Sequence, residues 1–297
     1  MGGRDTYGKP PPRRRPVGES VVSRRSLLRI PRSSAAAREI DFDSAQERVL
    51  RGWEAGSHNA LLRAVEPAAE VLVELAGLTP GQEVLDAGAG DGNLAVSAAR
   101  AGAEVYACDL SPSMVERGRA RSEAEGRQVA WRVADVQDLP YPDEHFDAVL
   151  SSFRAAHSPR ALRTAGELVR VARPGARVGI TAWVPRGLPG RLDELVDAVA
   201  PLPDGVPLPS AWGREEVVRR RLGPLLEALE VRTRTLRLTW DTPELAFEAL
   251  AAPYALDAVG RAALRPAFDR LLSSCNDRPP GVELSARYLI TLGRRPG

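Results

Sequence analysis

Short apolar runs recur through the middle of the chain and alternate with segments whose apolar residues repeat at helical spacing. Five runs predict buried strands, at 83–86, 103–109, 129–134, 146–152 and 177–183. Between them, the alanine-rich segment 94–102 and the segment 161–172, with Leu162, Ala165 and Leu168 on one face, predict helices. Strands that alternate with helices in this way predict an α/β fold with a parallel sheet.

The pattern before this region is helical. Residues 44–78 carry apolar side chains at helical spacing. Trp53 and His58 would line a site if these helices fold back over it. For Trp53 we expect packing against the sheet instead, because large aromatic residues most often serve the core.

The pattern after residue 184 mixes helices with two more strands. Prolines bracket a helix at about 191–200, and a second helix is predicted over 214–229. The alternating segment 231–238 predicts a half-exposed strand, and 284–292 predicts the last strand. The helical stretch between them forms an insertion at about 242–280, which we expect to cap a substrate pocket.

Three glycines at alternate positions follow the first predicted strand. The strand ends at Asp86, and Gly88, Gly90 and Gly92 come next, so that backbone can lie directly against a ligand. The dinucleotide fingerprint would need a third glycine at position 93, which is Asn93. A carboxylate at the strand end would also repel a pyrophosphate, whereas it would favour a cationic ligand group.

Acidic residues also end the second and third predicted strands. Asp109 lies 19 residues after Gly90, about the distance at which an acid reaches a ribose hydroxyl in such folds. Ser111 can cap the next helix and Pro112 can begin it. Asp135 follows the third strand at the same edge of the sheet.

In this order and at these intervals, the motifs together resemble the class I S-adenosylmethionine-dependent methyltransferases. The motifs are VLDAGAGDG at 84–92, CDLS at 108–111, ADV at 134–136, FDAV at 146–149 and LVRVARPG at 168–175 with Gly179. The first motif of this family commonly has cysteine or serine between its glycines, where this chain has Ala89, a conservative departure. The segment before the penultimate strand, Ala211-Trp212-Gly213, more loosely resembles a group of methyltransferases that act on small molecules.

The resemblance implies a Rossmann-like, doubly wound α/β fold with a seven-stranded, mostly parallel sheet, an antiparallel last strand and helical cap insertions. It implies a methyltransferase domain at 41–297, after a basic tail at 1–40 that we expect to be disordered. Within the domain it separates an N-terminal helical flank at 41–79, a cofactor-binding core at 80–184, and the remaining strands at 185–297.

The same resemblance implies the residues that bind the cofactor, S-adenosylmethionine. Its methionine part is assigned to Asp86, Ala87, Gly88 and Gly90, with Ser151 beneath the methionine end. The ribose hydroxyls are assigned to Asp109, and the adenine to Leu110, Met114, Asp135 and Val136.

The implied activity is transfer of a methyl group to an oxygen, nitrogen or carbon atom of a small molecule. His157 and Trp183 are candidates to contact this acceptor, and no catalytic residue is identified. Two other functions stay open: an NAD(P)-dependent oxidoreductase on a similar fold, and a protein that binds S-adenosylmethionine without catalysis.

Charge and composition limit the kinds of partner that the protein can bind. Residues 1–40 hold ten basic and three acidic residues, so that with a net charge of +2 the rest of the chain carries −5. A mildly acidic domain argues against nucleic acid as the substrate. No apolar run reaches the length of a membrane span, and we expect a cytoplasmic protein. Two cysteines, and no cluster with metal-ligand spacing, predict neither a disulfide framework nor a metal site.

Overall fold

The computed structural model describes residues 40–54 and 59–297. Residues 1–39 of the predicted tail at 1–40, and His58, therefore lie outside the described residues.

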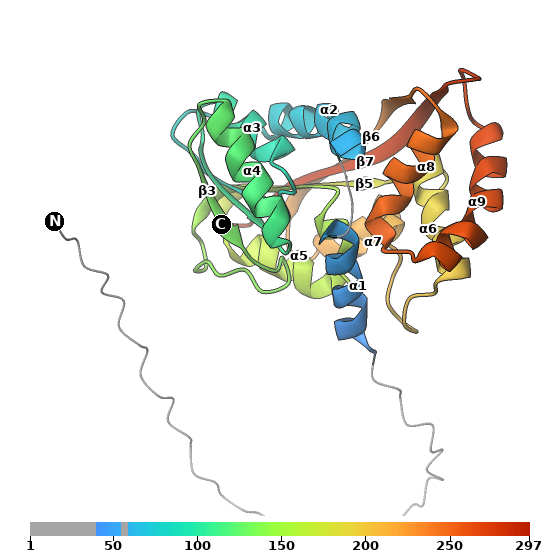
Figure 1. The fold of residues 1–297 in the computed structure, drawn as a ribbon. Coiled ribbons are helices and arrows are strands. Elements are labelled where there is room, and N and C mark those ends of the chain that lie inside the picture. Colours follow the sequence, from blue (N-terminus) through green and yellow to red (C-terminus); the bar gives the residue numbers. More distant parts are fainter. Residues whose placement is uncertain (1–39, 55–58) are drawn as a thin grey trace, which may run out of the picture. The chain divides into compact units, whose positions relative to one another are not determined.

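One sheet of seven strands organises the described chain (Figure 1). The strands are β1 (Glu83–Ala87), β2 (Glu104–Asp109), β3 (Val129–Val133), β4 (Phe146–Ser152), β5 (Ala172–Trp183), β6 (Glu227–Trp240) and β7 (Val282–Arg294). Their order across the sheet is β3-β2-β1-β4-β5-β7-β6. The first five pair in parallel, whereas β7 pairs antiparallel with both β5 and β6. The predicted seven-stranded, mostly parallel sheet with an antiparallel last strand is confirmed.

Helices cover both faces of the sheet (Figure 1). The helices are α1 (Phe42–Glu54), α2 (Asn59–Ala76), α3 (Asn93–Arg100), α4 (Pro112–Ala124), α5 (Ala161–Arg170), α6 (Leu188–Val199), α7 (Glu215–Leu222), α8 (Pro243–Ala251) and α9 (Ala258–Ser273). Three short 3-10 turns join them: η1 (Ala155–His157), η2 (Pro209–Gly213) and η3 (Ala252–Tyr254). Ser111 caps α4 by accepting the Met114 amide, and Pro112 begins that helix, as predicted.

Two apolar cores follow from the alternation of side chains along the strands. Val84 faces a core shared with α2, α3, α6, α8 and α9, while its neighbour Leu85 faces a core shared with α5 and α7. Both side chains are fully buried, as expected for a parallel strand with helices on each face. The sheet is therefore doubly wound.

Several predicted boundaries differ from the structure, two of them for a clear local reason. The helical flank contains two helices, α1 and α2. The helix predicted over 214–229 ends at Leu222, because Gly223 and Pro224 follow it and β6 begins at Glu227. Strand β5 begins at Ala172, five residues early, because an irregularity in its pairing with β4 accommodates Pro174.

Candidate functional site

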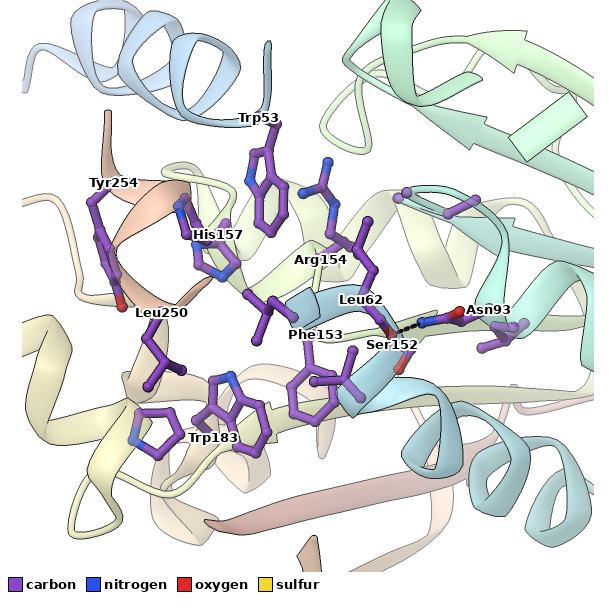
Figure 2. A pocket seen from close by; sticks show the side chains of 18 of the residues that line it. Trp53, Leu62, Asn93, Ser152, Phe153, Arg154, His157, Trp183, Leu250 and Tyr254 are labelled. Atoms are coloured by element: carbon purple, nitrogen blue, oxygen red, sulfur yellow. Dashed lines mark hydrogen bonds between the residues drawn. The ribbon is translucent and has the colours of Figure 1, made fainter. Parts of the chain in front are cut away.

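The candidate site lies where the strand order of the sheet reverses, between β1 and β4. In doubly wound sheets, ligands bind outside the carboxyl ends of the strands at such a point. A cavity opens there between the loop after β1, the segment after β4, and residues of α1, α6, α8 and η3 (Figure 2). A second cavity, between α1 and the ends of β2 and β3, adjoins it.

The loop after β1 forms the floor of the first cavity. Gly88, Gly90 and Gly92 have φ of 75°, 57° and 94°, values that glycine adopts at little cost. The amides of Gly88 and Ala89 both donate to the Cys108 carbonyl at 2.8 Å, which ties this loop to the end of β2. The loop therefore presents fixed backbone to a ligand, and helix α3 begins directly after it at Asn93.

Asp86 is a buried acid with one oxygen unused. Its Oδ2 accepts the Ala95 amide at 2.9 Å, whereas its Oδ1 is buried and has no hydrogen-bond partner among the described residues. Burial, reinforced by the nearby Asp109 carboxylate, raises the pKa of Asp86 to about 8. A cationic ligand group beside Oδ1 would satisfy this oxygen and favour the ionised carboxylate.

Asp109 lies at the end of β2 and is already engaged on both oxygens. The amides of Gly90 and Ser111 donate to it at 2.9 and 3.0 Å. The Arg154 guanidinium donates to both carboxylate oxygens, with three N–O distances between 2.9 and 3.2 Å. The same guanidinium lies 3.5 Å from the ring centre of Trp53.

Asp135 is engaged in a similar way from α1. The side-chain amides of Gln46 and Gln137 both donate to Asp135 Oδ2, at 3.0 and 2.9 Å respectively. Glu54, at the end of α1, accepts from the hydroxyls of Ser111 and Ser113. Helix α1 therefore lies over the second cavity and is held at several points along its length.

The predicted cofactor residues fall into three groups by position. Facing the first cavity are Asp86, Gly88 and Gly90, and facing the second are Gly88, Asp109, Leu110, Asp135 and Val136. Ala87, Met114 and Ser151 are fully buried and line neither cavity. The Ser151 hydroxyl accepts the Ala155 amide at 3.1 Å, and its neighbour Ser152 lines the first cavity instead.

Aromatic side chains form the far wall of the first cavity (Figure 2). Trp183, at the end of β5, stacks on Phe153 with ring centres 4.2 Å apart. His157 meets Trp53 edge to face at 5.8 Å. Burial, with Arg154 nearby, lowers the pKa of His157 to about 3, so its imidazole is neutral at physiological pH. Both predicted acceptor contacts, His157 and Trp183, line this cavity.

Trp53 lines the site as well as the core, and Arg154 is a site residue that was not predicted. Trp53 lines both cavities and contacts Arg154 and His157, and it is also buried in the apolar core cluster on that face of the sheet. The reason is that α1 crosses the carboxyl edge of the strands. The sequence did carry a signal for Arg154. It is a basic residue two positions after β4, a strand that ends at this edge of the sheet.

Neither a metal site nor a membrane span is found in the part of the chain that the structure describes. Over residues 40–54 and 59–297, no three His, Cys, Asp or Glu side chains come together as metal ligands. In the same ranges no helix combines the length and apolar character needed to cross a bilayer.

The residues that form the core of this site match a known protein family. Residues 84–175 match the sequence model of a family described as a methyltransferase domain. An uncharacterized protein of Mycobacterium tuberculosis is 33% identical over 262 residues, which covers 85% of this chain and 92% of that protein. Methyltransferase GfsG of Streptomyces halstedii is 36% identical over 146 residues, covering 48% of this chain and 51% of its own length.

A solved structure supports the same fold. It is phosphoethanolamine N-methyltransferase 2 of Haemonchus contortus, in complex with phosphomonomethylethanolamine and S-adenosylhomocysteine. The two chains superpose with a TM-score of 0.53 at 18% identity, over 78% of this chain and 53% of that one. At this identity the similarity is one of fold.

Proposed function

The chain belongs to the class I Rossmann-like methyltransferases, and from this premise we propose that it transfers a methyl group from S-adenosylmethionine to an oxygen, nitrogen or carbon atom of a small molecule. The observation that carries the proposal is the unpartnered Oδ1 of Asp86, buried beside a glycine loop. A buried carboxylate oxygen without a partner is costly unless a ligand satisfies it. S-adenosylmethionine carries an ammonium group that fits this role.

The two cavities divide between the two parts of such a cofactor. Asp86 and the Gly88–Gly90 backbone would hold the methionine part, since among the described residues only the Leu62 side chain, at 3.7 Å, lies within contact distance of a Cβ position on Gly90. Asp109 would hold the ribose hydroxyls, and the second cavity with Asp135 and Val136 would hold the adenine.

For this reaction the protein has mainly to position the two reactants and to exclude water. The sulfonium supplies an activated methyl group; the acceptor atom forms the new bond to it as the carbon–sulfur bond breaks and its electron pair returns to sulfur. The aromatic wall of Trp183, Phe153 and Trp53 would exclude water and orient an apolar or aromatic acceptor. We propose that the insertion at 242–280 completes this wall, because Leu250, Pro253 and Tyr254 line the cavity.

His157 can assist where the acceptor must lose a proton. Its imidazole is neutral and so can accept a hydrogen bond or a proton from a hydroxyl or amine in the cavity. The strongly lowered pKa makes it a weak base. We therefore assign it to orienting an acceptor hydroxyl more than to full proton abstraction.

Calorimetric titration of S-adenosylmethionine into the full chain tests the proposal. We expect binding in the micromolar range, weakened at least tenfold by Asp86→Asn, which keeps the side-chain shape and removes the carboxylate. Asp138→Asn is the matched control, because Asp138 is exposed and pairs only with Arg163 at the surface. Equal weakening in both variants, or no binding to folded wild type, would contradict the assignment.

Turnover is tested separately from binding. Formation of S-adenosylhomocysteine with a panel of aromatic acids, phenols and amines is the expected result for the wild type. Binding of the methyl donor without any product across such a panel would favour a non-catalytic binding protein instead.

A further inference from the structure

Arg154 lies across the boundary between the two cavities and lines both. Its side chain is only 10% exposed, and that of its partner Asp109 is 1% exposed. A Cβ placed on Gly88 would lie 2.7 Å from the Arg154 Cβ, so Arg154 packs tightly against the glycine loop. The guanidinium therefore occupies the part of the cleft that a ribose ring would cross.

Asp109 cannot hold Arg154 and a ribose at the same time. Its two oxygens offer about four acceptor positions. The amides of Gly90 and Ser111 use two, and the Arg154 guanidinium donates to both oxygens from the remaining side. Ribose hydroxyls that donate to Asp109 would need the positions that Arg154 fills. Entry of the nucleoside must therefore displace the guanidinium.

The displaced guanidinium would enter an apolar space with few partners. Arg154 Nη1 is already buried and has no hydrogen-bond partner among the described residues. Asp86 is the only other charged side chain among the described residues lining the first cavity, and the cofactor ammonium would occupy it. A desolvated cation of this kind is costly unless an anion pairs with it.

We propose that cofactor binding moves Arg154 from Asp109 into the first cavity, where its guanidinium binds a carboxylate of the methyl acceptor. The inference rests on the proposed function and adds to it the substrate class: an apolar, aromatic acceptor with an acidic group. Guanidinium is suited to this because its parallel N–H groups match a carboxylate. Phe153 and His157, on the same segment after β4, face the same cavity.

Benzoate and its neutral analogue benzamide are the probes. Each is titrated into the full-length protein alone, with saturating S-adenosylhomocysteine, and with saturating 5′-methylthioadenosine, which lacks the amino-acid part. We expect benzoate to bind at least tenfold more tightly when either nucleoside is present. Benzamide is expected to change less than threefold.

Arg154→Met tests whether this residue carries the effect. We expect the variant to lose the nucleoside-dependent gain in benzoate affinity while binding 5′-methylthioadenosine as tightly as the wild type or more tightly. Retained binding of 5′-methylthioadenosine also shows that the site of the variant is folded. Arg163→Met, which removes a surface arginine of α5, is expected to behave as the wild type. If Arg154→Met fails to fold, Arg154→Lys keeps the charge, and a partial gain is expected because ammonium lacks the bidentate geometry.

The possible outcomes separate the two proposals. If S-adenosylhomocysteine does not bind the wild type, the proposed function fails. If it binds and benzoate affinity stays unchanged, the role of Arg154 toward the acceptor fails. A gain with 5′-methylthioadenosine but none with S-adenosylhomocysteine would show that Arg154 binds the methionine carboxylate, and would overturn the assignment to the acceptor.

Discussion

The two ends of the cofactor cleft that we propose differ in how far their polar groups are already paired within the chain. At the methionine end, the glycine loop is held by backbone hydrogen bonds to Cys108, and Asp86 keeps an unsatisfied oxygen. At the adenosine end, Asp109 and Asp135 are both satisfied by side chains of the chain itself, Arg154 and Gln46 among them. One end keeps an unpartnered acceptor oxygen, and at the other end the acceptor oxygens already have partners within the chain.

This difference separates two kinds of binding cost. A ligand at the methionine end gains a contact with an oxygen that has no hydrogen-bond partner among the described residues, so few existing interactions must be broken. A ligand at the adenosine end exchanges its hydrogen bonds for existing ones and must displace the Arg154 and Gln46 side chains from Asp109 and Asp135. We therefore expect affinity to originate at the methionine end and conformational response at the adenosine end.

The largest expected effect comes from Gly88→Ala, in the loop that lines both cavities. The positive φ at this position costs about 1–2 kcal/mol for an L-residue, and the new Cβ would collide with Arg154. We expect a loss of about 2–4 kcal/mol in unfolding free energy and at least a hundredfold loss in S-adenosylhomocysteine affinity. Gly126→Ala is the control, since Gly126 has φ of 65° and no atom within 4 Å of a Cβ position. It should lose about 1 kcal/mol and keep full affinity; equal losses in both would refute the argument.

The pH dependence of stability should report the unsatisfied Asp86. Its pKa of about 8 in the folded protein exceeds the ordinary 3.8, so folding takes up a proton and stability falls as pH rises between these values. His157, with its pKa lowered to about 3 from 6.5, acts oppositely below pH 6.5. Between pH 6.5 and 8 only the Asp86 effect remains of these two, at about 1 kcal/mol per pH unit.

Urea unfolding of the cofactor-free protein at pH 6.5 and pH 8 measures this slope. We expect the wild type to be less stable at pH 8, and Asp86→Asn to show little difference between the two conditions. A slope of the same size in both proteins would mean that another group, such as the buried Asp193, is responsible.

Gly52→Ala should disturb the packing of α1 and leave the glycine loop in place. A Cβ on Gly52 would lie 2.0 Å from the Pro253 carbonyl oxygen, so α1 could no longer rest against η3. We expect amide hydrogen exchange in 42–54 to accelerate about tenfold, with exchange in β1 and α3 unchanged. Gly166→Ala, in α5 with open space around it, should be neutral or stabilising by up to about 1 kcal/mol. Faster exchange throughout the domain would remove the distinction between the two ends.

The smallest expected effect comes from Gln46→Ala. This change removes one donor that competes for Asp135 Oδ2. Because a hydrogen bond contributes about 1 kcal/mol net, we expect 5′-methylthioadenosine to bind about fivefold more tightly. Gln128→Ala, at an exposed position far from α1, is the control. Weaker binding in Gln46→Ala would show that Gln46 holds the nucleoside and does not compete with it.

Local pattern was sufficient to predict the sheet and the glycine loop. Alternation and apolar runs located all seven strands, because each strand has a buried face that the sequence records. The Ser111 cap and Pro112 were also predicted, since both depend on a few adjacent residues. Such features need no knowledge of what lies far away in the chain.

The occupied adenosine end could not be predicted, because it depends on distant pairs. Gln46 and Asp135 lie 89 residues apart, and Arg154 and Asp109 lie 45 apart. Trp53 was assigned to packing against the sheet for the same reason, since only the path of α1 across the sheet edge brings it to the cavity. Side-chain partners across such separations follow from the fold and leave no periodic signal.

Strand β7 has a consequence for how the chain is made. It lies between β5 and β6, yet it follows both in sequence. During synthesis, the ribosome releases β5 and β6 while the strand that joins them has not yet been translated, and each presents an unpaired edge. Such edges are templates for pairing between nascent chains. Residues 282–294 therefore complete the sheet and cover the open edge of β5 and one edge of β6, which lowers the risk that newly made chains pair with one another.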